Sequence, residues 1–118
     1  MSTIDSRSFD KPDETRRPAK SSIDIVRLGD NEVGRFTFEP GWRWSECIKP
    51  IVGGEACQVE HVGYVASGRL HVVHDDGSTA QLSAGDAYRI SPGHDAWVEG
   101  DQPFVGYEFK GAATYAKA

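Results

Sequence analysis

The stretch that decides the fold is CQVEHVGYVASGRL, which spans residues 57–70. Its residues alternate with a period of two, which is the pattern of a β-strand. One face of this strand carries small or apolar side chains and a single imidazole: Cys57, Val59, His61, Gly63 and Val65. Ser67 and Gly68 are typical turn residues, so we expect a second strand to begin near Leu70. His61 therefore points inward, where an imidazole is either a hydrogen-bonded core residue or a ligand.

Short β-rich runs separated by turn residues continue on both sides of this stretch. Upstream, the pattern predicts strands over residues 23–28, 33–38 and 42–47 and a loop over 51–56. Downstream, it predicts strands near 70–74, 78–82, 87–90, 96–99 and 103–110, with a hairpin signal at Asp75-Asp76-Gly77. Apart from a weak tendency over 112–118, no run has helical periodicity beyond one turn. Short strands at this spacing indicate an all-β sandwich or barrel.

The chain length and the change in composition along the chain indicate one domain. A chain of 118 residues can bury one sizeable core but not two. Residues 1–20 are polar and charged with very few apolar side chains, so we expect a flexible N-terminal arm there. We expect the domain over residues 21–112 and a short C-terminal tail over 113–118.

The charge and the polar N-terminus bear on partners and location. The formal net charge is −5, and the Lys and Arg residues beyond the N-terminal segment are scattered, which argues against nucleic acid as a partner. No apolar run approaches the ~20 residues that cross a bilayer, and residues 1–10 contain no apolar signal-peptide core. We therefore expect a cytoplasmic protein without a membrane partner, whose two cysteines are thiols rather than a disulfide.

Two sets of residues resemble the motifs of the cupin superfamily in type and spacing. The first set is Gly41, Cys47, His61 and Gly68, and the second is Gly85, Pro92, Gly93 and Ala96. The resemblance implies a single cupin jelly-roll β-barrel, in which both motifs carry metal ligands into the barrel.

The resemblance also shows which ligand positions are substituted. Cys47 and Lys49 stand where the superfamily has its first two histidines, His61 stands at the glutamate, and Ala96 stands at the last histidine. The ammonium group of Lys49 has no lone pair, and alanine cannot bind a metal. His94 is close enough to Ala96 in sequence to supply a donor. The implied metal site is Cys47, His61 and His94 with one water, which suits zinc, with iron, nickel or manganese as alternatives.

Three further side chains are expected around this site. Cys57 shares the inward face of His61 but would lie roughly 13 Å from it on a regular strand. It would be a donor only if a bulge or a start in the Gly53-Gly54 loop brought it closer, so it ranks below Cys47, and we expect it to line the pocket. Lys49 is the candidate for pairing with an anionic group, and Tyr88 is a candidate for the pocket wall. As an alternative to metal binding, Cys47 beside Lys49 would be a reactive thiolate, because a nearby cation lowers a thiol's pKa.

These residues leave three kinds of function open. The first is a metal-dependent enzyme that acts on a small oxygenated substrate. The second is a metal-free binding module that holds a small molecule between aromatic walls, with Lys49 pairing to an anionic group. The third is a structural role as a homodimer, because small cupins commonly dimerise through their sheets.

Overall fold

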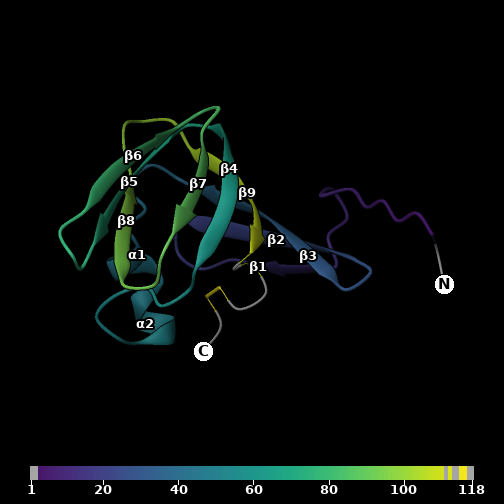
Figure 1. The fold of residues 1–118 in the computed structure, drawn as a ribbon, viewed down its shortest axis with the longest axis horizontal. Helices are drawn as coiled ribbons and strands as arrows, with labels where there is room; N and C mark the ends of the chain where they lie inside the picture. The colour runs from purple at the N-terminus through teal and green to yellow at the C-terminus, as the bar shows by residue number, and fades with distance from the viewer. Residues whose placement is uncertain (1–2, 111, 113–114, 117–118) are drawn as a thin grey trace.

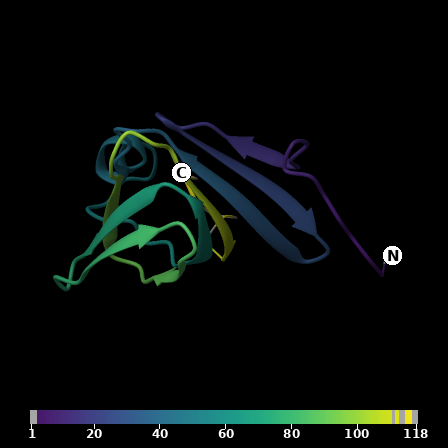
Figure 2. The same cartoon turned by 90° about the horizontal axis from the view of Figure 1, so that it is seen from above.

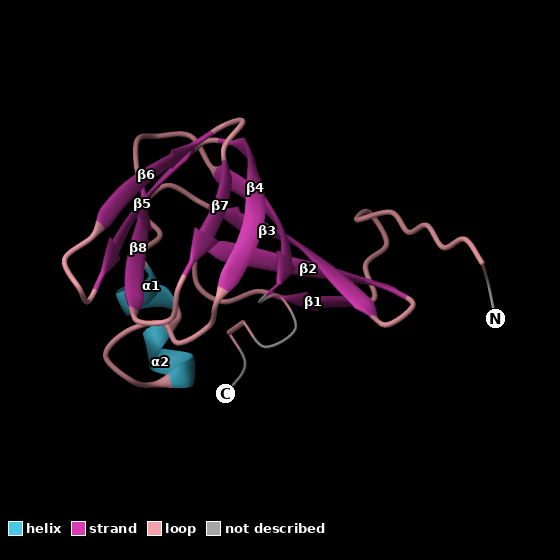
Figure 3. Cartoon of the chain, viewed as in Figure 1, coloured by secondary structure: helices cyan, strands magenta, loops and turns pink. Residues whose placement is uncertain are grey.

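The computed structural model describes residues 3–110, 112 and 115–116 and consists mainly of β-strands (Figure 1). The elements are β1 (Glu14–Arg16), β2 (Ser21–Leu28), β3 (Asn31–Phe38), α1 (Trp44–Cys47), α2 (Lys49–Val52), β4 (His61–Ser67), β5 (Arg69–His74), β6 (Thr79–Ser83), β7 (Ala87–Ile90), β8 (His94–Val98) and β9 (Phe104–Lys110). They form two antiparallel sheets, ordered β1-β2-β3-β9-β4-β7 and β6-β5-β8 (Figure 3). The predicted all-β fold class is confirmed, and β6 and β7 are edge strands of their respective sheets.

β4 follows the alternation that the sequence predicts for it. Inward residues such as His61 and Val65 are buried, whereas outward residues such as Tyr64 are exposed. β4 pairs with β7 on one side and with β9 on the other, which places it inside the six-stranded sheet. The strand turns into β5 at Gly68, where φ is 78° and a Cβ would collide with the carbonyl oxygen of Pro103. Glycine alone avoids both the strained φ and the collision.

The strand predicted over residues 42–47 is wrong, because α1 forms there instead. Trp44 and Cys47 are three residues apart, and both are buried because such a pair shares one face of a helical turn. Pro50 lies in the first turn of α2, where its missing N–H costs no hydrogen bond. α2 ends at Gly53, whose φ of 77° stops the helix. No helix in the described part of the chain is both long and apolar enough to span a membrane.

Part of the expected N-terminal arm belongs to the sheet. β1 pairs with β2 along its whole length, so the expectation of a flexible arm over residues 1–20 is corrected for this strand. The arm was expected from its lack of apolar side chains, but a strand ladder needs only backbone groups. Arg16 also donates to the carbonyl oxygens of Ala112 and Tyr115. The residues before β1 lead away from the body toward the N-terminus (Figure 2). Of the expected tail over 113–118, only residues 115–116 are described.

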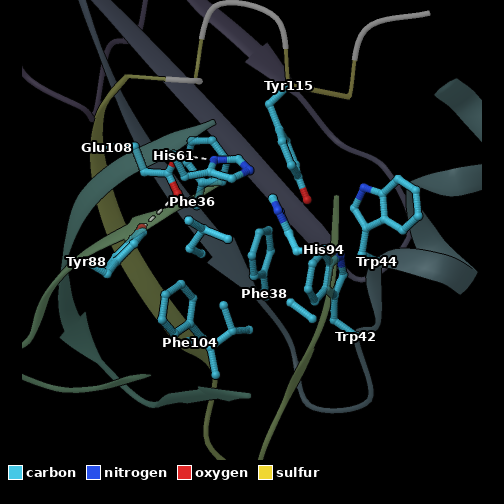
Figure 4. A pocket seen from close by; sticks show the side chains of 13 residues that line it. Phe36, Phe38, Trp42, Trp44, His61, Tyr88, His94, Phe104, Glu108 and Tyr115 are labelled. Carbon is cyan, nitrogen blue, oxygen red and sulfur yellow. Dashed lines mark hydrogen bonds and ion pairs between the residues drawn. The ribbon is translucent and has the colours of Figure 1, made fainter. Parts of the chain in front are cut away.

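Aromatic rings fill much of the space between the two sheets. Five of these side chains are each at most 4% exposed: Phe36, Phe38, Trp42, Trp44 and Phe104. Phe38 and Trp42 stack with their ring centroids 3.8 Å apart. Buried polar side chains, including His61, His94 and Glu108, lie against this cluster (Figure 4). The aromatic packing therefore forms an apolar surrounding for a small group of polar side chains.

Candidate metal centre

Three buried side chains with metal-binding atoms converge near the starts of β4 and β8. Cys57, His61 and His94 each offer one such atom, and these atoms all lie within 4.8 Å of one another. Sγ of Cys57 is 3.8 Å from Nε2 of His61, and the two imidazole centroids are 5.2 Å apart. Each of the three residues is at most 4% exposed. A thiol and two imidazoles form a donor set that suits zinc and related divalent metals.

A backbone bridge brings Cys57 into this group. The N–H of Cys57 donates to the carbonyl oxygen of His94 at 2.7 Å, and the carbonyl oxygen of Cys57 accepts from Gly93 at 2.6 Å. β4 begins only at His61, so residues 57–60 do not form a regular strand. The separation of roughly 13 Å expected for an extended chain therefore does not apply. Cys57 joins the histidines as a candidate donor in addition to lining a cavity.

Both imidazoles are oriented through their Nδ1 atoms. Nδ1 of His94 lies 2.7 Å from the carbonyl oxygen of Ser91, which can only accept, so Nδ1 carries the proton. Nδ1 of His61 lies 2.5 Å from Oε1 of Glu108, and the Tyr88 hydroxyl donates to Oε2 of the same carboxylate at 2.7 Å (Figure 4). In each ring the contact at Nδ1 leaves Nε2 as the nitrogen that can bind a metal. This arrangement, with an acceptor on the far nitrogen, is the usual support for a metal-binding histidine.

The charges in the group favour a thiolate beside an imidazolium in the metal-free protein. Burial raises the pKa of Cys57, but hydrogen bonds and positive charge from His61 and His94 outweigh it and lower this pKa to about 6. Burial lowers the pKa of His61, but the negative charge of Glu108 and the hydrogen bond to Cys57 outweigh it and raise this pKa to about 9. Burial beside Glu108 raises the pKa of Tyr88, so its hydroxyl stays protonated and donates.

Two cavities border the group. The smaller has a volume of ≈ 20 Å³ and is lined by both histidines, Glu108 and aromatic rings (Figure 4). Since a water molecule needs roughly 10–15 Å³, this cavity holds one water-sized group. The larger cavity, of ≈ 150 Å³, is lined by Cys57 and by apolar residues of α1 and α2. Trp44 and Tyr115 line both cavities.

The other residues singled out from the sequence take different places. Cys47 is buried in the core cluster but is not part of the donor group, because α1 replaces the strand that would have aimed it toward His61. Lys49 begins α2 and pairs with Glu55 at 3.5 Å, and it lines neither cavity. Tyr88 lines the smaller cavity.

Glu108 and Tyr115 are important residues that the sequence reasoning missed. Glu108 is 4% exposed and lies on the inward face of β9, two residues from Gly106 and four from Phe104. The alternation of β9 could have indicated an inward carboxylate. Tyr115 falls in a segment without a clear pattern, so no comparable signal exists for it.

No protein-family model matches the chain, and no curated protein sequence matches it. Solved structures match it in fold. A cupin domain from Bordetella pertussis is 22% identical, with a TM-score of 0.53, over 80% of this chain and 95% of its own. A cupin-like protein from Thermotoga maritima is 16% identical, with a TM-score of 0.53, over 78% of this chain and 68% of its own. CapF, solved with the inhibitor 3-isopropenyl-tropolone, is 15% identical, with a TM-score of 0.57, over 83% of this chain and 30% of its own. The chain therefore has a cupin fold, and at these identities the likeness concerns the fold alone.

Proposed function

We propose that this protein binds one divalent metal ion, zinc, through Cys57, His61 and His94, and uses it to bind a small oxygen-bearing molecule. The observation that carries the proposal is the convergence of three buried donors within 4.8 Å. The hydrogen bonds from the Nδ1 atoms of both imidazoles support it, because they leave each Nε2 to face the group.

The distances between the donors fit a zinc ion. Ligand atoms about 2.0–2.3 Å from a tetrahedral zinc lie roughly 3.5 Å from one another. The 3.8 Å between Sγ of Cys57 and Nε2 of His61 is close to this value, and the remaining separations are at most 4.8 Å. Three protein donors leave a fourth position open, which is the arrangement of catalytic rather than structural zinc sites.

The residues around the donors have separable roles. Glu108 accepts from Nδ1 of His61 and fixes the direction of Nε2, while the Tyr88 hydroxyl holds Glu108 in place. The aromatic lining restricts the space beside the histidines to a water-sized group. A divalent metal bound by these donors supplies a Lewis acid that polarises an oxygen of the bound molecule. CapF, whose fold this chain matches over 30% of CapF's length, was solved with a small organic inhibitor.

Elemental analysis of protein purified without a chelator or a metal-binding tag tests the metal proposal. We expect close to one zinc per chain in the unaltered protein and in the matched control Cys47→Ser. Cys57→Ser and His94→Gln should each lose most of the metal. Retention of zinc in Cys57→Ser together with its loss in Cys47→Ser would assign the site to the other cysteine and contradict the proposal.

A specific observation favours a second function, in which Cys57 is a metal-free nucleophile. Sγ of Cys57 lies 3.8 Å from Nε2 of His61, and Nδ1 of the same ring lies 2.5 Å from Oε1 of Glu108. A thiol, an imidazole and a carboxylate in this order are the nucleophile, the base and the orienting group of cysteine-dependent enzymes. In this case the protein as purified contains no zinc, and a small alkylating reagent modifies Cys57 faster than Cys47. Glu108→Gln should then slow the alkylation of Cys57 alone.

A further inference from the structure

Two buried indole N–H groups beside the candidate metal centre have no hydrogen-bond acceptor among the described residues. They belong to Trp42 and Trp44, each 1% exposed. An indole nitrogen can only donate, and leaving a buried donor unpaired is unfavourable. Both rings line the smaller cavity together with His61 and His94, and the nitrogen edge of Trp44 is turned toward the hydroxyl end of Tyr115 (Figure 4). An acceptor that enters the site, such as a ligand oxygen, would satisfy these donors.

Trp44 occupies the boundary between the two cavities. It lines the ≈ 20 Å³ cavity beside the histidines and also the ≈ 150 Å³ cavity beside Cys57. A cavity of about 150 Å³ is large enough to take a six-membered ring such as benzene. A ligand whose ring lies in the larger cavity can direct one oxygen toward Trp44 and the centre at the same time.

The lining of the larger cavity indicates the charge of this ligand. Ile48, Val52 and Val59 supply apolar surface, and Gln58 supplies an amide. No Lys, Arg, Asp or Glu is among its lining in the described part of the chain. Lys49, the nearby cation, pairs with Glu55 instead. Without a bound metal, an anionic ligand would lose its hydration in this cavity and meet no cationic side chain in the lining, whereas an uncharged one would not.

We propose that the molecule bound at this centre is a small, uncharged carbonyl compound, whose apolar body fills the larger cavity and whose oxygen accepts a hydrogen bond from Nε1 of Trp44. This inference rests on the proposed function and deepens it by naming the class of ligand. Because Trp44 lines the smaller cavity together with His61 and His94, this oxygen would lie on the side of the ligand that faces the candidate metal centre.

Three probes of similar size test the proposal by ligand-observed NMR titration, with metal-free and zinc-loaded protein. Cyclohexanone carries the carbonyl, methylenecyclohexane has the same shape without an oxygen, and cyclohexanecarboxylate is an anion. We expect cyclohexanone to bind about fivefold more tightly than methylenecyclohexane, the effect of one hydrogen bond of about 1 kcal/mol, and the carboxylate to bind most weakly to the metal-free protein. Equal binding of the ketone and the hydrocarbon, stronger binding of the carboxylate than of the ketone to metal-free protein, or no binding of the ketone would overturn the proposal.

Two tryptophan variants separate the donor from the ring. Trp44→Phe keeps an aromatic wall and should lose the preference for the ketone while it still binds the hydrocarbon. Trp97→Phe is the matched control, because Trp97 stacks on His71 away from both cavities, and it should keep the preference. If Trp44→Phe does not fold, the indole N–H resonance of Trp44 in the unaltered protein gives the answer, since cyclohexanone should shift it and methylenecyclohexane should not. An unmoved resonance would contradict the proposal.

Failure of this inference and failure of the metal proposal give different results. If the protein binds one zinc but does not prefer the ketone, the metal proposal stands and the proposed ligand class is wrong. If the protein binds no zinc but prefers the ketone, and Trp44→Phe removes that preference, the hydrogen-bond donor site stands and the metal proposal is wrong.

Discussion

At the scale of single residues, Glu108 decides which nitrogen of His61 faces the thiol of Cys57. Its carboxylate is 4% exposed and accepts from Nδ1 of His61 and from the Tyr88 hydroxyl. Removing such an acceptor allows the ring to rotate and to change tautomer. The loss therefore lowers metal affinity as well as the stability of the fold.

We predict that Glu108→Ala weakens zinc binding by about 10–100-fold, the usual range for loss of a residue that supports a metal-binding histidine. Glu108→Gln should lose less, because an amide oxygen can still accept from Nδ1. The affinities are measured by competition with a zinc-binding dye. Glu60→Ala is the control, since Glu60 pairs with Lys110 and Arg89 at the surface. Equal losses in Glu108→Ala and Glu60→Ala would show that Glu108 has no specific role.

A second residue-scale prediction concerns the Cys57 thiol in metal-free protein. Burial raises its pKa, but the neighbouring imidazoles outweigh burial and lower the pKa to about 6. In a Cys47→Ser background, the thiolate ultraviolet absorbance should therefore rise with pH around a midpoint near 6. His61→Gln removes the group that lowers the pKa of Cys57 most, so the midpoint should move up toward or beyond the ordinary value of 9.0. A midpoint that His61→Gln leaves unchanged would contradict the contact between the two side chains.

At the scale of the elements, the turn from β4 into β5 carries the chain from the six-stranded sheet to the three-stranded sheet. Gly68 and Gly77 both have a positive φ, of 78° and 92°. They differ in space, because a Cβ at Gly68 would meet the backbone of Pro103 and Phe104, whereas one at Gly77 would meet nothing within 4 Å. Alanine substitutions at the two positions therefore separate the free-energy cost of the left-handed backbone from that of the collision.

We predict that Gly77→Ala lowers the free energy of unfolding by about 1–2 kcal/mol, the cost of a left-handed backbone. Gly68→Ala should lower it by about 2–5 kcal/mol, since overpacking adds about 1–3 kcal/mol. Urea denaturation measures both values. Equal losses at the two positions would show that the β4–β5 turn moves to accept the added methyl group.

The elements also show how far sequence reasoning reaches. β4 was predictable because alternation and the turn at Gly68 agree within one short stretch. α1 was not, because a helix of only four residues is too short to leave a helical periodicity in the sequence. Cys57 was predicted too far from His61 because the bridge to His94 joins residues far apart in sequence.

At the scale of the whole molecule, the candidate centre joins the two sheets. His61 belongs to β4 in the six-stranded sheet, and His94 belongs to β8 in the three-stranded sheet. Glu108, on β9, lies 47 positions from its partner His61, so this contact depends on the complete fold and left no local signal. A metal bound to both histidines would tie the two layers together.

Zinc should therefore stabilise the folded protein as a whole. At a free zinc concentration 100 times its dissociation constant, the gain is about 2.7 kcal/mol, which for a chain of this size raises Tm by on the order of 10 °C. Differential scanning calorimetry with and without zinc measures the shift. Cys57→Ser should show little of it, whereas Cys47→Ser should keep it. A shift of the same size in Cys57→Ser would indicate that zinc binds elsewhere.

The most direct test of the central claim is X-ray absorption spectroscopy at the zinc edge on the zinc-loaded protein, on Cys47→Ser and on Cys57→Ser. We predict one sulfur at about 2.3 Å and two imidazole nitrogens at about 2.0 Å from the metal in the unaltered protein and in Cys47→Ser. The sulfur should be absent in Cys57→Ser. A spectrum without sulfur in the unaltered protein, or a sulfur that persists in Cys57→Ser, would contradict the assignment of the metal site to Cys57, His61 and His94.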